Sequence, residues 1–306
     1  MAIRRTPLLM AAAVLALGGC GSGSGGGGKA PAEVRTAAKP ATPVTPVTLP
    51  KPDHVVVVLF ENKEDKQVHG SSTAPYFNAL AARGATFTNS TGVTHPSQPN
   101  YLALFSGSTQ GVSGDDCLSA GKFAGPDLGG ELIAAGKTFA GYSESMPSDG
   151  FTACTGKGPG GDYASKHNPW RDFSDVPAAD NRTFAAFPQD FSQLPTVSFV
   201  VPNMCDDMHD CGVATGDAWL KAGLGAYADW APAHNSLLVV TFDEDDFTEA
   251  NVIPTIIVGA GVKPGPTAQH IDHYAMLRTL EDLYGLPHAG ASAQAAPITG
   301  IWTTGS

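Results

Sequence analysis

The sequence is poor in positive charge. It has 18 lysine and arginine residues against 29 aspartate and glutamate residues, which gives a formal net charge of −11. This acidic balance argues against a protein that holds nucleic acid or anionic lipid by broad charge attraction. An acidic enzyme that acts on a phosphate ester needs a local source of positive charge, and a bound metal ion can supply it.

A long apolar run is also lacking. The N-terminal apolar stretch follows Arg4 and Arg5 and ends in small residues before Cys20, so it is shorter than the roughly 20 residues of a membrane span. This pattern predicts a secretory signal peptide over residues 1–20, and "LGGC" resembles a bacterial lipobox in which Cys20 is acylated. We therefore expect an exported lipoprotein on the bacterial envelope, with a periplasmic or secreted protein as the alternative.

The next segment has too little apolar content to build a core. Residues 21–50 are rich first in glycine and serine and then in proline and threonine, as is typical of a linker. The remaining residues, 51–306, are expected to form one domain, and the overall hydrophobic content of 42% suits a sizeable core.

Cysteine is scarce as well. With Cys20 set aside, four remain: Cys117, Cys154, Cys205 and Cys211. An even number in an oxidising compartment favours two disulfides over a metal site. Three pairings are possible. We favour Cys205–Cys211, which closes a short loop, together with Cys117–Cys154, which joins two glycine-rich segments.

The folded part alternates between apolar runs and amphipathic stretches, and no internal repeat is visible. The main expected strands are 54–60, 196–203, 235–242 and 253–261, and the main expected helices are 74–84, 216–230 and 273–287. This alternation predicts an α/β fold with a single doubly wound, mostly parallel sheet flanked by helices. Residues 145–190 are rich in Gly, Pro, Asp and Asn, so irregular loops are expected there, as a cap over the site.

Three of the apolar runs end in polar clusters. Glu61 and Asn62 follow "VVVVLF", "PNMCDDMHD" follows the strand that ends near Val201, and "DEDD" follows "LLVVTF". Functional residues of such sheets gather just past the carboxyl ends of the strands. Because carboxylates and imidazoles are common ligands of divalent cations, these clusters predict a metal site at one edge of the sheet.

A nucleophile candidate lies in "THPSQPNYLALF". Ser97 stands two residues before Pro99, at the expected start of a helix whose free backbone N–H groups suit phosphate oxygens. A nearby cation would favour the serine alkoxide, so no histidine–aspartate pair is required. The structural alternative for an isolated serine here is a helix N-cap, and Thr94 is the rival hydroxyl.

The chain resembles the bacterial phosphoesterase family of acid phosphatases and phospholipase C-like enzymes, within the alkaline phosphatase superfamily. The resemblance extends from about His54 to Pro287. The segments that carry it, in order, are "HVVVVLFENK", "THPSQPNYLALFSGSTQG", "KHNPW", "FVVPNMCDDMHDC", "VTFDEDD", "IPTIIVG" and "DHYAMLRTLEDLYGLP". The resemblance implies an alkaline phosphatase-like fold and one or two divalent metal ions, either Zn, Mg, Ca or Mn.

The resemblance also implies roles for individual residues. The implied metal ligands are Glu61, Asp207, His209, Asp243, Glu244 and His273, with Asp206 as an alternative to Asp207. The implied catalytic residues are Ser97 as nucleophile, Asn62, Asn100, Lys166 and His167. Packing on Trp170 is an alternative role for His167. The acidic pair Asp243–Glu244 stands where many relatives have Asp-His, which makes that site less zinc-like.

These observations predict an exported, metal-dependent hydrolase of phosphate monoesters that acts through a phosphoserine intermediate. The expected partner is a small phosphate ester or a phospholipid, with no nucleic acid, and membrane contact only through the N-terminal lipid anchor. One alternative is a phosphodiesterase or phospholipase C-type enzyme acting on lipid head groups. Another is a non-catalytic surface-binding lipoprotein. A sulfatase is disfavoured because "SQPNY" lacks the Cys/Ser-x-Pro-x-Arg pattern.

Overall fold

The computed structural model describes residues 49–303. The expected signal peptide, the acylated Cys20 and nearly all of the expected linker lie outside these described residues. No helix within residues 49–303 has both the length and the apolar character that a bilayer-spanning helix needs.

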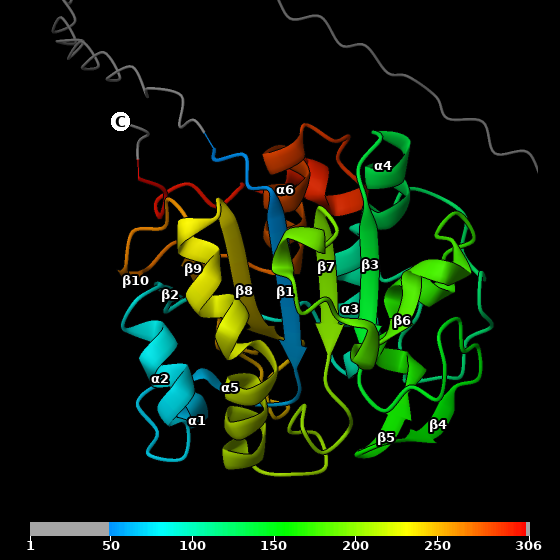
Figure 1. Cartoon of the computed structure of the whole chain (residues 1–306), viewed down its shortest axis with the longest axis horizontal. Coiled ribbons are helices and arrows are strands. Elements are labelled where there is room, and N and C mark those ends of the chain that lie inside the picture. Colours follow the sequence, from blue (N-terminus) through cyan, green and yellow to red (C-terminus); the bar gives the residue numbers. More distant parts are fainter. Residues whose placement is uncertain (1–48, 304–306) are drawn as a thin grey trace, which may run out of the picture. The chain divides into compact units, whose positions relative to one another are not determined.

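An eight-stranded sheet forms the centre of this part of the chain, in the order β10-β2-β9-β8-β1-β7-β3-β6 (Figure 1). Its strands are β1 (His54–Phe60), β2 (Ala85–Phe87), β3 (Phe139–Ser143), β6 (Asn181–Thr183), β7 (Val197–Val201), β8 (Ser236–Phe242), β9 (Ile256–Gly259) and β10 (Gly265–Thr267). All neighbours pair in parallel except β9, which is antiparallel to both β8 and β2. The predicted single, mostly parallel α/β sheet is therefore confirmed.

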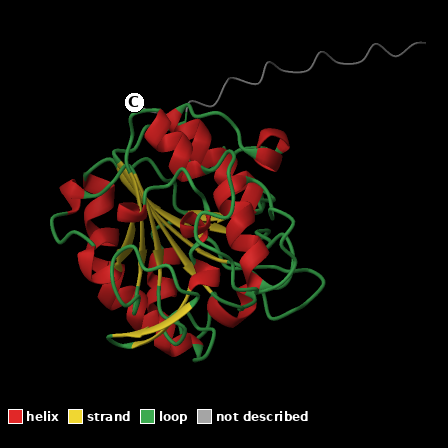
Figure 2. Ribbon diagram, turned by 90° about the vertical axis from the view of Figure 1, so that its right-hand side faces the viewer, coloured by secondary structure: helices red, strands yellow, loops and turns green. Residues whose placement is uncertain are grey.

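Helices cover both faces of the sheet (Figure 2). One face carries α1 (Asp65–Val68), α2 (Pro75–Ala81) and α5 (Val213–Trp230), and the other carries α3 (Ser97–Ser106), α4 (Leu128–Ala134) and α6 (His273–Tyr284). In β1, Val55 and Val57 face the α3–α6 side, whereas Val56 and Val58 face the α2–α5 side. Burial on both faces explains why β1 is a continuous apolar run.

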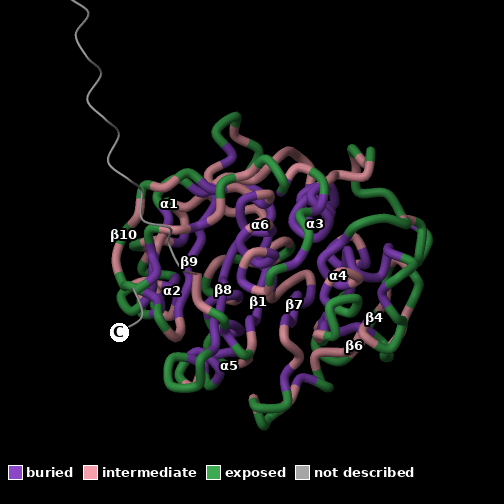
Figure 3. The backbone as a smooth tube through the Cα atoms, turned by 90° about the horizontal axis from the view of Figure 1, so that it is seen from above, coloured by how far each residue is buried: buried purple, intermediate pink, exposed green. Residues whose placement is uncertain are grey.

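Helix α3 lies deep in the molecule. All ten of its residues are buried, and Figure 3 shows it beside the buried central strands. The helix ends at Gly107, which has a φ of 66°. A Cβ atom at this position would lie 1.9 Å from the carbonyl oxygen of Ala289. Glycine therefore permits both the left-handed turn and the close approach of the distant segment at Ala289.

Residues 145–190 are more regular than expected. They contain the hairpin of β4 (Thr155–Gly158) and β5 (Gly161–Ala164), the edge strand β6, and several 3-10 turns. The 3-10 turns of the described chain are η1 (Ser165–His167), η2 (Pro169–Asp172), η3 (Ala178–Asp180), η4 (Phe184–Ala186), η5 (Phe191–Gln193), η6 (Ala231–Ala233) and η7 (Gly290–Gln294). The expectation of irregular loops is corrected here, because elements of three or four residues are too short to show a periodic pattern.

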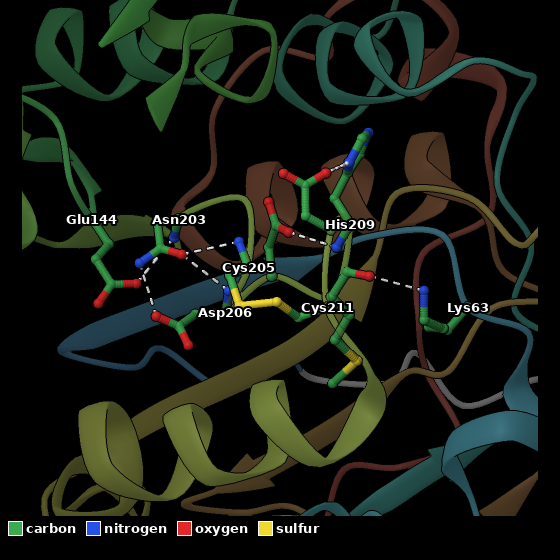
Figure 4. The surroundings of a disulfide bond; sticks show 10 residues. Lys63, Glu144, Asn203, Cys205, Asp206, His209 and Cys211 are labelled. Atoms are coloured by element: carbon green, nitrogen blue, oxygen red, sulfur yellow. Dashed lines mark hydrogen bonds and ion pairs between the residues drawn. A yellow bond between two sulfur atoms is a disulfide. The ribbon is translucent and has the colours of Figure 1, made fainter. Parts of the chain in front are cut away.

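Both favoured disulfides are confirmed. Cys117 pairs with Cys154 at a Cα–Cα distance of 5.5 Å, and Cys205 pairs with Cys211 at 4.7 Å. The second bond closes the loop that follows β7. Figure 4 shows this disulfide beside His209, with Lys63 on one side and Asp206 on the other.

Candidate active site

Three neighbouring strands bring the acidic clusters together. Glu61 follows β1, Asp243 follows β8, and Asp207 lies in the loop after β7, while β8, β1 and β7 are adjacent in the sheet. The Glu61 N–H donates to the Asp207 carbonyl at 2.8 Å, and the Asp243 N–H donates to the Phe60 carbonyl at 3.1 Å. The backbone therefore fixes these three acidic residues at one edge of the sheet.

Ser97 faces two of the carboxylates. Its Oγ lies 2.9 Å from Oε2 of Glu61 and 3.2 Å from Oε1 of Glu244, and the residue is only 2% exposed. It is the first residue of α3 and does not act as an N-cap, because Pro96 occupies that position. The hydroxyl of Thr94 donates instead to the His95 carbonyl. Ser97 can donate its proton to only one of these two carboxylates at a time.

A buried triad of Glu61, His167 and Asp207 lies beside Ser97. One ligand atom from each lies within 4.8 Å of the others. The Nε2 of His167 is 3.1 Å from Glu61 Oε1, and its Nδ1 is 3.3 Å from Asp207 Oδ2. Burial lowers the pKa of His167 well below its ordinary value, so the ring is neutral and carries one N–H. At least one ring nitrogen therefore turns a lone pair toward a carboxylate, an arrangement that a cation would stabilise.

The electrostatics of the site also favour a bound cation. Burial raises the pKa of Glu61 and Asp207 well above their ordinary values, and repulsion from Asp243 raises both further. Burial raises the pKa of Asp243 to about 6, and burial with repulsion from Asp243 raises that of Glu244 to about 7. Carboxyl groups so perturbed will take up either protons or a metal ion.

Several buried oxygen atoms of the site have no hydrogen-bond partner within the described residues. They are Asn62 Oδ1, Asp207 Oδ2 and Asp243 Oδ2. Unpaired buried polar atoms are rare in native proteins and call for an explanation such as a bound ion. The donor set, mostly oxygen with one imidazole, suits a divalent cation. The residues present therefore fit a metal ion.

Lys166 and His209 lie at the edge of this cluster. The Nζ of Lys166 donates to Asp115 Oδ2 at 2.9 Å and lies 3.3 Å from Nε2 of His209. The other ring nitrogen of His209 contacts Asp210 at 2.7 Å. His209 is thus outside the triad, whereas His167, expected to contact phosphate, is inside it. The hydrogen bond to Asp115 and the negative charges of Glu61 and Asp243 raise the pKa of Lys166 against the opposing effect of burial.

Two other predicted residues make positioning contacts. Nε2 of His273 lies 2.6 Å from the backbone carbonyl of Asp243, so the imidazole contacts the main chain at the end of β8. The Asn100 side chain accepts from the Val93 and Thr94 N–H groups and donates to the Thr94 and Pro96 carbonyls. The side chain of Asn100 therefore forms its hydrogen bonds with the backbone of the loop before Ser97 and none with the carboxylates.

Two acidic residues next to the predicted ligands, Asp206 and Asp245, make contacts outside the triad. The carboxylate of Asp206 accepts from Asn203 at 2.8 Å, on the far side of the disulfide from Lys63 (Figure 4), and it is absent from the triad that contains Asp207. Asp245 is fully buried and accepts from the Thr248 N–H at 2.9 Å. The carboxylate of Asp245 therefore organises the following turn and does not face solvent.

Sequence reasoning missed three residues that contact this site. Tyr101 donates to Oε1 of Glu61 and stacks on His167 with ring centroids 5.0 Å apart. His95 contacts the carboxylate of Glu244, and Asp115 joins Lys166 to the N–H of Gln98. Tyr101 could have been found from its spacing, because it lies one helical turn after Ser97 and shares its face of α3.

Comparison with known proteins identifies the family. A model of the phosphoesterase family matches residues 60–287. The chain belongs to the phosphoesterase family. It is 49% identical over 267 residues to a phosphatidylinositol-3-phosphatase of Mycobacterium tuberculosis, a match that covers 87% of this chain and 88% of that protein. By this homology the phosphoesterase is an enzyme of the phosphatase type.

More distant relatives agree. An acid phosphatase of Aspergillus fumigatus is 29% identical over 229 residues, which cover 69% of this chain and 51% of that protein, so the phosphoesterase spans about half of this longer relative. Among solved structures, the lipoteichoic acid synthase LtaP from Listeria monocytogenes superposes with a TM-score of 0.56 at 11% identity, over 82% of this chain and 74% of that one. A protein of the alkaline phosphatase superfamily from Vibrio parahaemolyticus gives a TM-score of 0.52 at 13% identity, over 79% and 70%. These likenesses confirm the alkaline phosphatase-like fold.

Proposed function

We propose that this phosphoesterase hydrolyses phosphate monoesters through a phosphoserine formed on Ser97. The observation that carries the proposal is the position of the Ser97 hydroxyl, buried and within 3.2 Å of the carboxylates of both Glu61 and Glu244. A hydroxyl used only for folding would cap the helix or bond to backbone. The Ser97 hydroxyl instead contacts two carboxylates, whose negative charge a cation would balance.

We propose that one or two divalent cations are held by Glu61, His167 and Asp207 and by the neighbouring Asn62, Asp243 and Glu244. A cation there supplies the positive charge that favours the serine alkoxide and neutralises the phosphoryl oxygens. Zn, Mg, Ca and Mn remain the candidate ions, and the oxygen-rich donor set favours the harder ones.

The chain's own residues then perform the transfer. The Ser97 proton passes to one of the two adjacent carboxylates, and Oγ attacks phosphorus while the ester P–O bond breaks and the leaving alkoxide takes a proton from water. A water molecule next attacks the phosphoserine, which releases phosphate and restores the hydroxyl. Lys166, beside the triad, and the N-terminal turn of α3 add positive potential around the phosphoryl group.

The relatives suggest the range of substrates. The mycobacterial relative is a phosphatidylinositol-3-phosphatase and the fungal relative is an acid phosphatase, so both a phosphoinositide head group and small monoesters are candidates. A phosphodiesterase or phospholipase C activity would use the same residues. A non-catalytic protein is disfavoured, because Ser97 and its carboxylate partners are all present.

Export is part of the proposal. The two disulfides within residues 49–303 are typical of proteins that fold in an oxidising compartment. Together with the signal-like residues 1–20 and Cys20, they support a lipoprotein on the outside of the cytoplasmic membrane, or a protein released there.

The test is the Ser97→Ala variant, with Thr94→Ala as the matched control at the rival hydroxyl. We expect Ser97→Ala to lower phosphate release from p-nitrophenyl phosphate by about a thousandfold or more, with bound metal unchanged by elemental analysis. Thr94→Ala should keep most of the activity. Near-normal turnover by Ser97→Ala would overturn the nucleophile assignment. Faster turnover of bis-p-nitrophenyl phosphate than of the monoester would show a diesterase.

A further inference from the structure

Phe247 is exposed beside the candidate active site. Within residues 49–303, the large apolar side chains that remain exposed are Phe247, at 66%, and Ile133, at 37%. Phe247 follows Glu244 by three residues, on the loop after β8. Large apolar side chains exposed at the edge of a polar site are commonly used for binding.

The loop holds Phe247 in a defined place. Its φ is 69°, in the left-handed region that a residue with a Cβ seldom adopts. The preceding Asp245 donates its N–H to Asn251 Oδ1 at 2.9 Å, and its carboxylate accepts from the Thr248 N–H. Asn251 also donates to the Thr94 carbonyl at 3.0 Å, which ties the loop to the segment before Ser97. The turn is therefore braced on both sides of Phe247.

His95 connects Phe247 to the catalytic groups. The two rings stack with centroids 4.8 Å apart and planes 19° from parallel. One nitrogen of His95 contacts the carboxylate of Glu244, and the other lies 3.2 Å from the Thr248 carbonyl. Exposure falls from 66% at Phe247 to 24% for the His95 side chain and 1% for the Glu244 side chain. A chain of contacts thus runs from the exposed ring of Phe247 through His95 to Glu244, whose Oε1 lies 3.2 Å from the Oγ of Ser97.

We propose that the free face of Phe247 is a subsite that stacks on the alcohol part of an aryl phosphate ester. This inference rests on the proposed function and deepens it by naming a substrate class. Ser97 and its carboxylate partners are buried, so the phosphoryl group must lie deep while its organic substituent extends outward. An aromatic ring fixed at the exit offers a planar apolar surface, and stacked aromatic pairs gain affinity beyond simple burial.

The charge around Phe247 argues against a membrane anchor. Asp246 and Glu249 flank it and are both exposed. Acidic side chains at this position would be repelled by the anionic surface of a bilayer that contains phosphoinositides. A neutral aryl group meets no such penalty, so a stacked substrate fits the loop better than a lipid surface does.

The experiment compares Phe247→Ala and Phe247→Trp with the wild type on p-nitrophenyl phosphate and on glycerol 2-phosphate. We expect Phe247→Ala to raise KM for the aryl ester about 3- to 10-fold with little change in kcat, and to leave both constants for glycerol 2-phosphate within about twofold. Phe247→Trp should retain the wild-type KM. Ile133→Ala, which removes the other exposed apolar side chain, serves as the control.

Binding measurements separate this proposal from the proposed function. Calorimetry with phenylphosphonate and methylphosphonate requires no turnover, and the wild type should prefer the phenyl compound by a margin that Phe247→Ala loses. The subsite proposal would be overturned if Phe247→Ala weakened the binding of both phosphonates equally, or raised KM equally for both esters. Unchanged kinetics with weaker binding to vesicles containing phosphatidylinositol phosphate would also overturn it, in favour of a membrane contact. Absence of turnover in the wild type with the phenyl preference intact would count against the proposed function alone.

Discussion

The Oγ of Ser97 lies 2.9 Å from Oε2 of Glu61, although the two residues are 36 positions apart in the sequence. This contact joins the start of α3 to the end of β1. A serine beside a buried carboxylate is a poor nucleophile, because the negative charge opposes loss of its proton. A cation held by the neighbouring carboxylates would offset that charge and favour the serine alkoxide.

Removal of the His167 imidazole should weaken metal binding. His167→Gln retains a polar side chain but loses the ring nitrogens that lie 3.1 Å from Glu61 and 3.3 Å from Asp207. We expect at least a tenfold loss of metal affinity, on the order of what altered ligand shells cause, measured by calorimetric titration of metal-free protein. His209→Gln is the control and should have a smaller effect. A fall in kcat with unchanged metal affinity would instead support a phosphate contact for His167.

The hydroxyl of Tyr101 should matter for activity and little for folding. Tyr101→Phe removes the donor to Glu61 but keeps the ring that stacks on His167. We expect kcat to fall by about tenfold, because Glu61 loses its fixed orientation, with a loss of roughly 1 kcal/mol in the free energy of unfolding. Tyr227→Phe, which removes a buried hydroxyl bonded to the Leu237 carbonyl at 3.0 Å, should lower stability similarly and leave kcat unchanged. Equal kcat values for both variants would contradict this role.

The two disulfides should have separable effects. Loss of Cys205–Cys211, with a sequence separation of 6, should cost about 2 kcal/mol of unfolding free energy, whereas loss of Cys117–Cys154, with a separation of 37, should cost about 4 kcal/mol. Because the short loop carries Asp207, its double alanine variant should lose more metal affinity despite the smaller loss of stability. Urea unfolding and metal titration of both variants test this. Metal affinities that follow stability alone would contradict it.

Asp127 should make stability depend on pH. It is the N-cap of α4 and accepts from the Gly130 N–H at 2.9 Å. Burial, together with the neighbouring Asp175, raises its pKa to about 8 against the opposing effect of the backbone contacts. The folded state therefore holds this proton more tightly than the unfolded chain, whose aspartate has a pKa of about 3.9. Stability should fall as pH rises from about 5 to about 8 and then become level.

The measurement compares wild type with Asp127→Asn by urea unfolding between pH 5 and 9 at a constant metal concentration. Asparagine keeps the capping oxygen and removes the titration, so the slope of stability against pH should be shallower by up to about 1.4 kcal/mol per pH unit. Glu131, whose pKa is raised to about 7 by burial, should leave a residual slope in the variant. Identical slopes in the two proteins would exclude a titrating Asp127.

Much of the fold could be predicted because its signals are local. The apolar run of β1 and the helical spacing in α6 mark buried elements, and parallel strands must place Glu61 and Asp243 at one edge. The direction of β9 could not be predicted, because an apolar strand reads the same when paired in either direction. The contact of His167 with Glu61 and Asp207 could not be predicted from the sequence either. His167 lies in a 3-10 turn, in a segment whose sequence shows no periodicity. The position of such a segment is set by tertiary packing, as where Trp170 packs against Gly141 of β3.

The complete burial of α3 constrains how this enzyme can change. Any side chain altered along that helix disturbs the interior, and the disturbance reaches the nucleophile at its first residue. New substrate preferences are therefore more accessible through the exposed residues Asp246, Phe247 and Glu249 of the loop after β8, where replacements do not have to fit a packed interior. Libraries designed to redirect the enzyme should vary that loop and leave the helix intact.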